Sequence, residues 1–201
     1  AAQWLQMTWM FFYDKKKWTQ PRIRSFLKAV PDNKLILLDY YCDHTEIWRN
    51  TEKYYGNPYI WCYLGNFGGN TMIAGNLNDI DFKIKRLFKE GGDNVYGLGA
   101  TLEGFDVNPL MYEFVFDQAW DYPVTTDQWI TNWSMCRGGN QDANIIKAWR
   151  ALHQKIYTEH ATCGQSVLMN ARPRLTGTKV GIQTPAYITQ ITTYGKYGKS
   201  Y

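Results

Sequence analysis

One glutamate stands where a strand of this sequence is expected to give way to a loop, and a carboxylate there can act as an acid, a base or a nucleophile. The residue is Glu103, within the run NVYGLGATLEGFDVNP at residues 94–109. Glycines on both sides would let a ligand or another backbone approach closely. In α/β folds, ligands gather at the carboxyl ends of strands. Glu103 is therefore a candidate catalytic residue, and the alternative is a loop residue that faces water.

The composition is that of a folded chain with many aromatic side chains. The sequence has 201 residues, of which 45% are hydrophobic and 16% aromatic, so the chain can bury a core. Nine Trp and fifteen Tyr suit a sugar-binding cleft, where flat rings stack on pyranoses. They suit a dense core equally well, so composition leaves both readings open.

Charge, cysteine and histidine usage argue against several classes of site. The net charge is +4, and the single basic run, at residues 15–17, is explained by a solvated turn better than by nucleic-acid binding. The four cysteines are far apart and the three histidines do not cluster, so neither a metal site nor another cofactor is predicted. No apolar run is long enough to cross a bilayer.

Hydrophobic spacing predicts strands that alternate with helices. Strands are expected within residues 3–12, over 35–41 and 59–64, and from 95 toward Glu103; the first is expected to be buried and followed by a loop. Helices are expected from Thr19 to Val30, over 73–89, and from the Asn108-Pro109 pair onward. Repeated βα units make parallel sheets. Four strands are half of the eight that close a barrel of about 250 residues, and a half barrel would leave two unpaired edges.

The pattern changes from Val124 onward. Thr125 with Gln128 three residues later forms a capping box that predicts the start of a helix. A second helix is predicted from apolar residues at helical spacing over 145–156. The sequence therefore predicts an α/β domain over residues 1–123 and the beginning of a mostly helical domain with an irregular tail over 124–201.

Several stretches together resemble one enzyme family. They are residues 35–70 with the distinctive run IWCYLGNFGGN, the run GATLEG at 99–104, the aromatic stretch 4–11 and the triplet Ala171-Arg172-Pro173. These stretches resemble the α-N-acetylglucosaminidases of glycoside hydrolase family 89, up to about Leu175. The resemblance implies the C-terminal half of a (β/α)8 TIM-type barrel followed by the beginning of an α-helical domain. It also suggests an extracytoplasmic location, secreted, periplasmic or lysosomal.

The resemblance further implies a reaction and a division of labour. Family members remove a terminal α-linked N-acetylglucosamine from a glycan with retention at the anomeric carbon. Retaining glycosidases use two carboxyls roughly 5 Å apart. Glu103 matches the family's nucleophile, whereas the general acid belongs to an Asn-Glu pair upstream of the segment that Ala1 begins. The expectation is a glycosidase fragment that is inactive without the remainder of the parent polypeptide; the alternative is a non-catalytic carbohydrate-binding or structural fragment.

The resemblance assigns further residues to the substrate site. Asp39 matches an Asp of the family and would orient a neighbour or bind a sugar hydroxyl, whereas Asp43 is expected to be solvated. Trp9 is similar to a family Trp, although Met7 and Thr8 replace the usual Gln-Gly before it.

Two more candidates lie at the end of the strand expected at 59–64. Trp61 could form the floor of the sugar site, and the amide of Asn66 could hydrogen-bond sugar hydroxyls. The alternative is that Trp61 is barrel core and that the glycines around Asn66 only shape a tight turn.

Overall fold

The computed structural model describes residues 2–31, 34–65, 73–104, 108–120 and 124–160. The chain divides into two compact units, each built from segments that are distant in sequence. The first unit comprises residues 1–64, 79–102 and 112–123, and the second comprises 65–78, 103–111 and 124–201.

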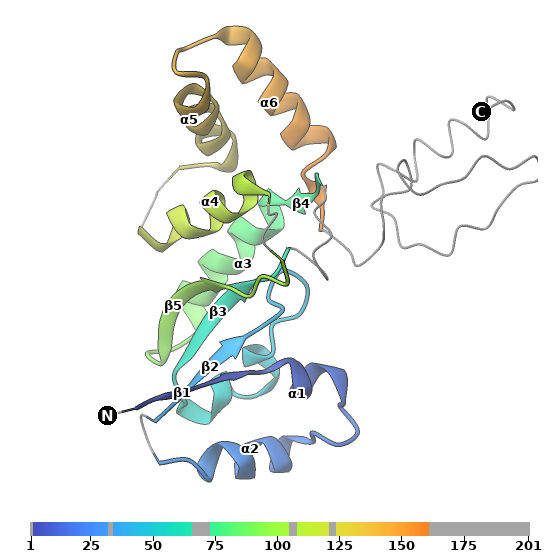
Figure 1. The fold of residues 1–201 in the computed structure, drawn as a ribbon, viewed down its shortest axis with the longest axis vertical. Helices are drawn as coiled ribbons and strands as arrows, with labels where there is room; N and C mark the ends of the chain where they lie inside the picture. The colour runs from blue at the N-terminus through green and yellow to red at the C-terminus, as the bar shows by residue number, and fades with distance from the viewer. Residues whose placement is uncertain (1, 32–33, 66–72, 105–107, 121–123, 161–201) are drawn as a thin grey trace, which may run out of the picture. The chain divides into compact units, whose positions relative to one another are not determined.

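A four-stranded parallel sheet forms the centre of the first unit (Figure 1). Its strands, in spatial order, are β1 (Trp4–Met7), β2 (Leu35–Asp39), β3 (Tyr59–Tyr63) and β5 (Val95–Ala100). Asp39 pairs with Trp61, which pairs in turn with Leu98. The carboxyl ends of β2, β3 and β5 therefore lie at one edge, as predicted for repeated βα units.

Two longer helices belong to the βα units. Helix α2 (Gln20–Lys28) begins after Thr19, as predicted, and buries Ile23 and Leu27. Helix α3 (Leu77–Glu90) buries apolar residues at helical spacing from Leu77 to Leu87. The hydroxyl of Tyr59 on β3 donates to the carbonyl of Gly91 just after α3, which ties the helix end to the sheet.

Helix α3 begins later than the apolar spacing predicted. Ile73 was expected in its first turn, but it lies outside the helix and is 66% exposed. Gly75 and Asn76 form a short strand, β4. Gly75 has a φ of +151° and packs against the side chain of Met111. Because Gly75 has a non-helical backbone and lies close to Met111, the helix does not include it and begins at Leu77.

The first strand also differs from the prediction. β1 was expected to be buried, yet Trp4 and Leu5 are 66% and 65% exposed. Within the described sheet β1 is an edge strand with β2 as its one neighbour, so one side of its backbone has no strand partner there. A short helix, α1 (Trp9–Tyr13), follows it in place of the expected loop.

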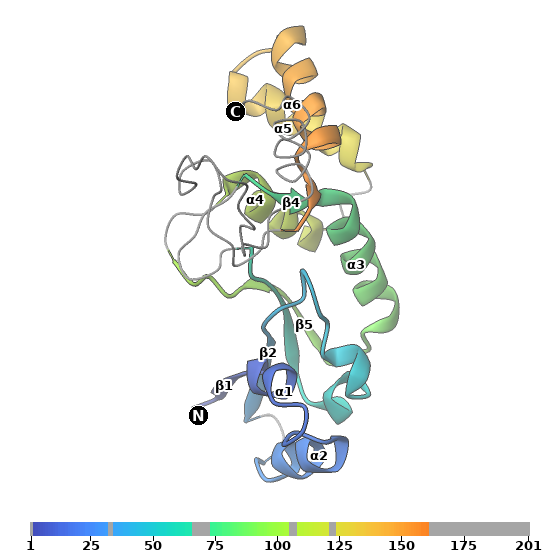
Figure 2. The same cartoon turned by 90° about the vertical axis from the view of Figure 1, so that its right-hand side faces the viewer.

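The second unit contains a helical hairpin (Figure 2). Its helices are α5 (Thr126–Gly138) and α6 (Ala143–Lys155). The hydroxyl of Thr125 accepts a hydrogen bond from the backbone N–H of Gln128 at 3.2 Å, which confirms the predicted cap. The indoles of Trp133 and Trp149 meet edge to face with centroids 4.6 Å apart.

Shorter elements complete the described chain. Strand β4 (Gly75–Asn76) pairs antiparallel with β6 (Thr158–Glu159). Helix α4 (Pro109–Asp117) begins at the predicted proline and continues into the short helix η3 (Gln118–Trp120). Two further 3₁₀ turns, η1 (Trp48–Asn50) and η2 (Lys53–Gly56), lie between β2 and β3. None of the described helices is both long and apolar enough to cross a membrane.

Candidate functional site

Glu103 lies in the bend that follows β5. The strand itself ends at Ala100, three residues earlier than Glu103, and the side chain of Glu103 is exposed. Between them, Thr101 is buried and continues the ladder, because its backbone N–H donates to the carbonyl of Tyr63 at 3.1 Å. Glu103 therefore follows a fixed strand end, in a position where its carboxylate is accessible.

Asp39 is the last residue of β2, and its carboxylate points into the protein. It is fully buried and accepts the backbone N–H groups of Ile47 at 3.2 Å and Trp48 at 2.9 Å. Burial raises the pKa of Asp39 from 3.8 to about 7, and the two backbone hydrogen bonds oppose part of that rise. Asp39 thus organises the segment after β2, which agrees with a role in orienting its neighbours.

Replacing Asp39 with alanine is expected to destabilise the complete protein by roughly 2–4 kcal/mol near pH 4, because two buried N–H groups lose their acceptor. The folded-state pKa is raised, so the stability that Asp39 contributes is full below about pH 4. It declines as the pH rises to about 7 and is constant above that. Urea unfolding of both proteins across this range measures the difference; a difference that grows with pH would contradict this assignment.

Trp61 is fully buried in the sheet. Its indole N–H donates to Oε1 of Glu46 at 3.0 Å, and the same oxygen accepts the indole N–H of Trp48 at 3.1 Å. Arg86 forms an ion pair with the other carboxylate oxygen of Glu46. This geometry favours the alternative in which Trp61 is core, because its side chain has no exposed surface and its indole N–H is already bonded to Glu46. Nothing in the sequence indicated that Glu46 belongs to the site, because its hydrogen-bond and ion-pair partners come from three separate segments.

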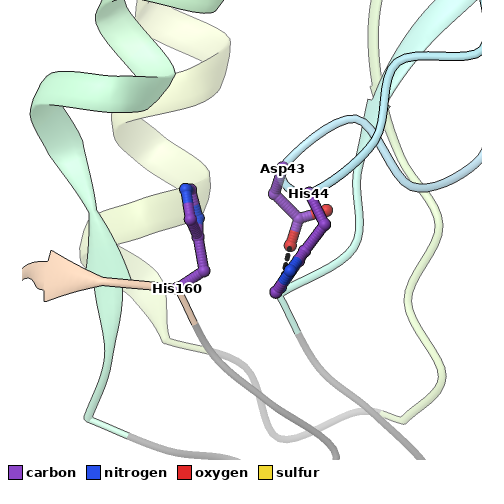
Figure 3. A group of neighbouring side chains, drawn as sticks. All are labelled: Asp43, His44 and His160. Atoms are coloured by element: carbon purple, nitrogen blue, oxygen red, sulfur yellow. Dashed lines mark ion pairs between the residues drawn. The ribbon is translucent and has the colours of Figure 1, made fainter. Parts of the chain in front are cut away.

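The expectation that Asp43 is solvated is wrong. Asp43 is buried, and its carboxylate accepts the backbone N–H of Leu64 at 3.2 Å. Its own carbonyl accepts the ammonium of Lys83 at 2.6 Å. Nε2 of His44 lies 3.9 Å from Oδ2 of Asp43, the dashed line in Figure 3, and forms an ion pair with it when the imidazole is protonated. The first residue beyond β3 needs an acceptor for its N–H, and Asp43 supplies it.

Trp9 opens α1, beyond the carboxyl end of β1. Its ring lies near those of Phe12, Tyr40 and Tyr41, with centroids 5.1, 5.7 and 5.5 Å away. Trp9 is 37% exposed, so the cluster presents an indole surface to solvent. These four residues form the aromatic cluster at the strand ends. Asn66 and the triplet at 171–173 lie outside the described residues.

Two protein-family models match the chain. The family model described as "Alpha-N-acetylglucosaminidase (NAGLU) tim-barrel domain" matches residues 1–122. The chain belongs to the α-N-acetylglucosaminidase family. The model of the C-terminal domain of the same family matches residues 129–197.

The relatives of this α-N-acetylglucosaminidase family member are longer than the chain. It is 31% identical to the human alpha-N-acetylglucosaminidase over 160 residues, which are 78% of the chain and 21% of the human protein. The chain therefore spans about a fifth of that relative.

Two solved structures of a family 89 glycoside hydrolase from Clostridium perfringens show the same fold. The complex with PUGNAc has a TM-score of 0.71 and 22% identity, covering 99% of the chain and 23% of the hydrolase. The other is a variant with two glutamates replaced by glutamine, bound to its substrate GlcNAc-α-1,4-galactose. It has a TM-score of 0.69 and 22% identity, covering 97% of the chain and 22% of the variant. The predicted fold class, part of a TIM-type barrel with a helical domain, is thereby confirmed.

The structure gathers several of the predicted residues of this family member at one edge of the sheet. Asp39 and Trp61 are paired in register, and both are linked to the η1 turn, through the backbone N–H of Trp48 and through Glu46. Trp9 contacts Tyr40, the residue after Asp39. This edge is the one at which barrel enzymes carry their chemistry.

Proposed function

We propose that the complete protein containing this chain is a retaining exo-α-N-acetylglucosaminidase and that Glu103 is its nucleophile. The observation that carries the proposal is the match of the family's barrel domain over residues 1–122, with Glu103 following the carboxyl end of β5 in the run GATLEG. The human relative is named for this activity, and the clostridial variant is described with GlcNAc-α-1,4-galactose as its substrate. We infer a glycan with a terminal α-linked N-acetylglucosamine as the substrate here.

In this proposal Glu103 attacks the anomeric carbon from the β face. The bond from that carbon to the leaving oxygen breaks as a second carboxyl donates its proton to the oxygen, leaving a β-linked glycosyl ester on Glu103. The second carboxyl, now ionised, takes a proton from a water molecule, which attacks the same carbon. The ester bond breaks, Glu103 is regenerated as a carboxylate, and N-acetylglucosamine leaves in its α form. Two inversions give net retention.

We infer that the second carboxyl comes from a part of the protein outside this chain. Asp39 ends β2, and Asp43 and Glu46 lie in the segment after it; each is buried with its carboxylate bound to N–H donors. Such groups hold loops in place and are poorly suited to give a proton to a substrate. The chain spans about a fifth of the human relative, so the complete protein has ample sequence to supply another carboxyl.

The remaining parts of the chain have supporting roles in this proposal. The aromatic cluster around Trp9 offers a partly exposed ring on which a sugar can stack. Asn66 would hydrogen-bond sugar hydroxyls, and Asp39 would keep the segment after β2 in position. The division near residue 123 is also part of the proposal; the two family matches end at 122 and begin at 129.

The stereochemical course of the reaction tests this function. The complete protein is expected to hydrolyse an aryl α-N-acetylglucosaminide, and proton NMR spectra recorded in the first minutes should show α-N-acetylglucosamine before mutarotation forms the β anomer. An aryl β-N-acetylglucosaminide of the same leaving group serves as the matched control and should stay intact. Initial release of the β anomer would mean an inverting mechanism, and the nucleophile assignment would then be wrong.

A further inference from the structure

Tyr40, the residue just after β2, is hydrogen-bonded to a threonine hydroxyl through its backbone N–H and to another through its carbonyl. The hydroxyl of Thr8, after β1, accepts the backbone N–H of Tyr40 at 3.4 Å and donates to the carbonyl of Leu38 at 3.0 Å. The hydroxyl of Thr101, after β5, donates to the carbonyl of Tyr40 at 2.7 Å. Both threonines are buried. Hydrogen bonds to the backbone of Tyr40 therefore link the ends of β1, β2 and β5.

The bond from Thr101 reaches across a strand. β3 lies between β2 and β5 in the sheet, so the backbone ladder cannot join those two strands directly. The backbone N–H of Thr101 donates to Tyr63 on β3, while the hydroxyl of the same residue reaches Tyr40 beyond it. Two bonds from one residue thus fix the end of β5 against both strands.

These hydrogen bonds of Thr101 matter because β5 contains glycines, which weaken a strand. It contains Gly97, with a φ of +144°, and Gly99, whose missing side chain leaves room for Ile60 and Cys62 of β3. Glycine inside a strand gives up packing and costs backbone entropy on ordering. The side chain of Thr101 supplies at the strand end the anchor that these glycines cannot supply.

We propose that Thr101 is a positioning residue for Glu103. Glu103 is two residues further along, and two residues span at most about 7 Å, so the anchor at Thr101 sets where the backbone leaves the sheet. This inference rests on the proposed function, in which Glu103 attacks the anomeric carbon. Thr101 itself makes no contact with substrate; it acts through the position of the attacking carboxylate.

Substitutions that keep the shape or keep the hydroxyl separate this role from packing. Thr101→Val has nearly the same shape but cannot donate to Tyr40, whereas Thr101→Ser keeps the donor. Displacement of a nucleophile by about 1 Å can lower the reaction rate on the order of 10²-fold. Thr101→Val should therefore lower kcat by roughly 10- to 100-fold. Its KM should stay near the wild-type value, and Thr101→Ser should retain most of the activity.

Thr51→Val is a matched control. The hydroxyl of Thr51 is also buried and also donates to a backbone carbonyl, that of Ile47 at 2.9 Å. It lies between η1 and η2, and its hydroxyl bonds to a residue four positions earlier, not to the end of another strand. Losing this bond should lower the unfolding temperature without lowering kcat per folded molecule.

The experiment uses the complete protein with four substitutions, Thr101→Val, Thr101→Ser, Thr51→Val and Glu103→Gln. Calorimetric titration with 2-acetamido-1,2-dideoxynojirimycin, an inhibitor bound in a clostridial relative, counts the competent sites. Turnover is then measured per site with aryl substrates whose leaving groups differ in acidity. A displaced nucleophile predicts that Thr101→Val loses rate with every leaving group, because the proton donor is unaffected.

The outcomes distinguish this inference from the proposed function. Wild-type kcat per site for Thr101→Val, with Glu103→Gln inactive, would overturn the positioning role and leave the nucleophile in place. If Thr101→Val lost turnover only in proportion to its loss of inhibitor-binding sites, the positioning role would be overturned as well. The same holds if misfolding removed all of the sites. Activity of Glu103→Gln near the wild-type level would overturn the proposed function itself.

Discussion

Replacing Glu103 with glutamine in the complete protein is expected to abolish turnover and to leave the fold intact. The amide is nearly the same size as the carboxylate, but it cannot form the glycosyl ester. Loss of one member of a catalytic pair lowers kcat by roughly 10³-fold or more. Because Glu103 is exposed and follows the end of β5, the substitution should not change the unfolding temperature appreciably.

Steady-state kinetics with an aryl α-N-acetylglucosaminide, together with thermal unfolding, measure this effect. Glu90→Gln provides a matched control, since Glu90 is an exposed carboxylate at the end of α3 and has no role in the proposed chemistry. The control should behave as the wild type. Near-normal activity of Glu103→Gln would rule out Glu103 as the nucleophile.

The second large effect concerns the chain on its own. Residues 1–201 are expected to be nearly inactive on the same substrate, because we infer that the second carboxyl lies outside them and proton donation contributes roughly 10²–10⁴-fold. The isolated chain is also expected to aggregate. β1 is an edge strand with Trp4 and Leu5 exposed, and an apolar groove of about 500 Å³ lies between β1 and α2. Unpaired apolar edges of this kind promote association.

Size-exclusion chromatography and activity per mole, measured beside the complete protein, test this expectation. The alternative function, a non-catalytic carbohydrate-binding fragment, predicts a soluble chain that binds N-acetylglucosaminides without cleaving them. Turnover by a monodisperse monomer of residues 1–201 would contradict the inference that the general acid lies elsewhere.

Local patterns predicted the elements that depend on local physics. The cap at Thr125 and the start of α2 after Thr19 follow from side chains within one helical turn, and both are found in the structure. The parallel sheet could also be predicted, because continuous apolar runs such as 35–38 are typical of strands covered on both faces. The exposure of β1 could not, since hydrophobicity indicates what a strand can bury and not what lies beside it.

The interior of the candidate site could not be predicted for a different reason. Glu46 binds Trp61 and Arg86, which are 15 and 40 residues away in sequence. Asp43 was expected in solvent, but its carboxylate accepts the backbone N–H of Leu64, 21 residues later. Such partners are fixed by how βα units stack, and no spacing in the sequence encodes them.

Labelling of the nucleophile tests the central claim most directly. A 5-fluoro-α-N-acetylglucosaminyl fluoride has an activated leaving group and a substituent that slows the second step, so the glycosyl ester should accumulate on the complete protein. Digestion and tandem mass spectrometry then locate the added sugar. We expect a single labelled peptide in which the sugar is attached to Glu103. Attachment to any other carboxylate, with Glu103 unmodified, would contradict it.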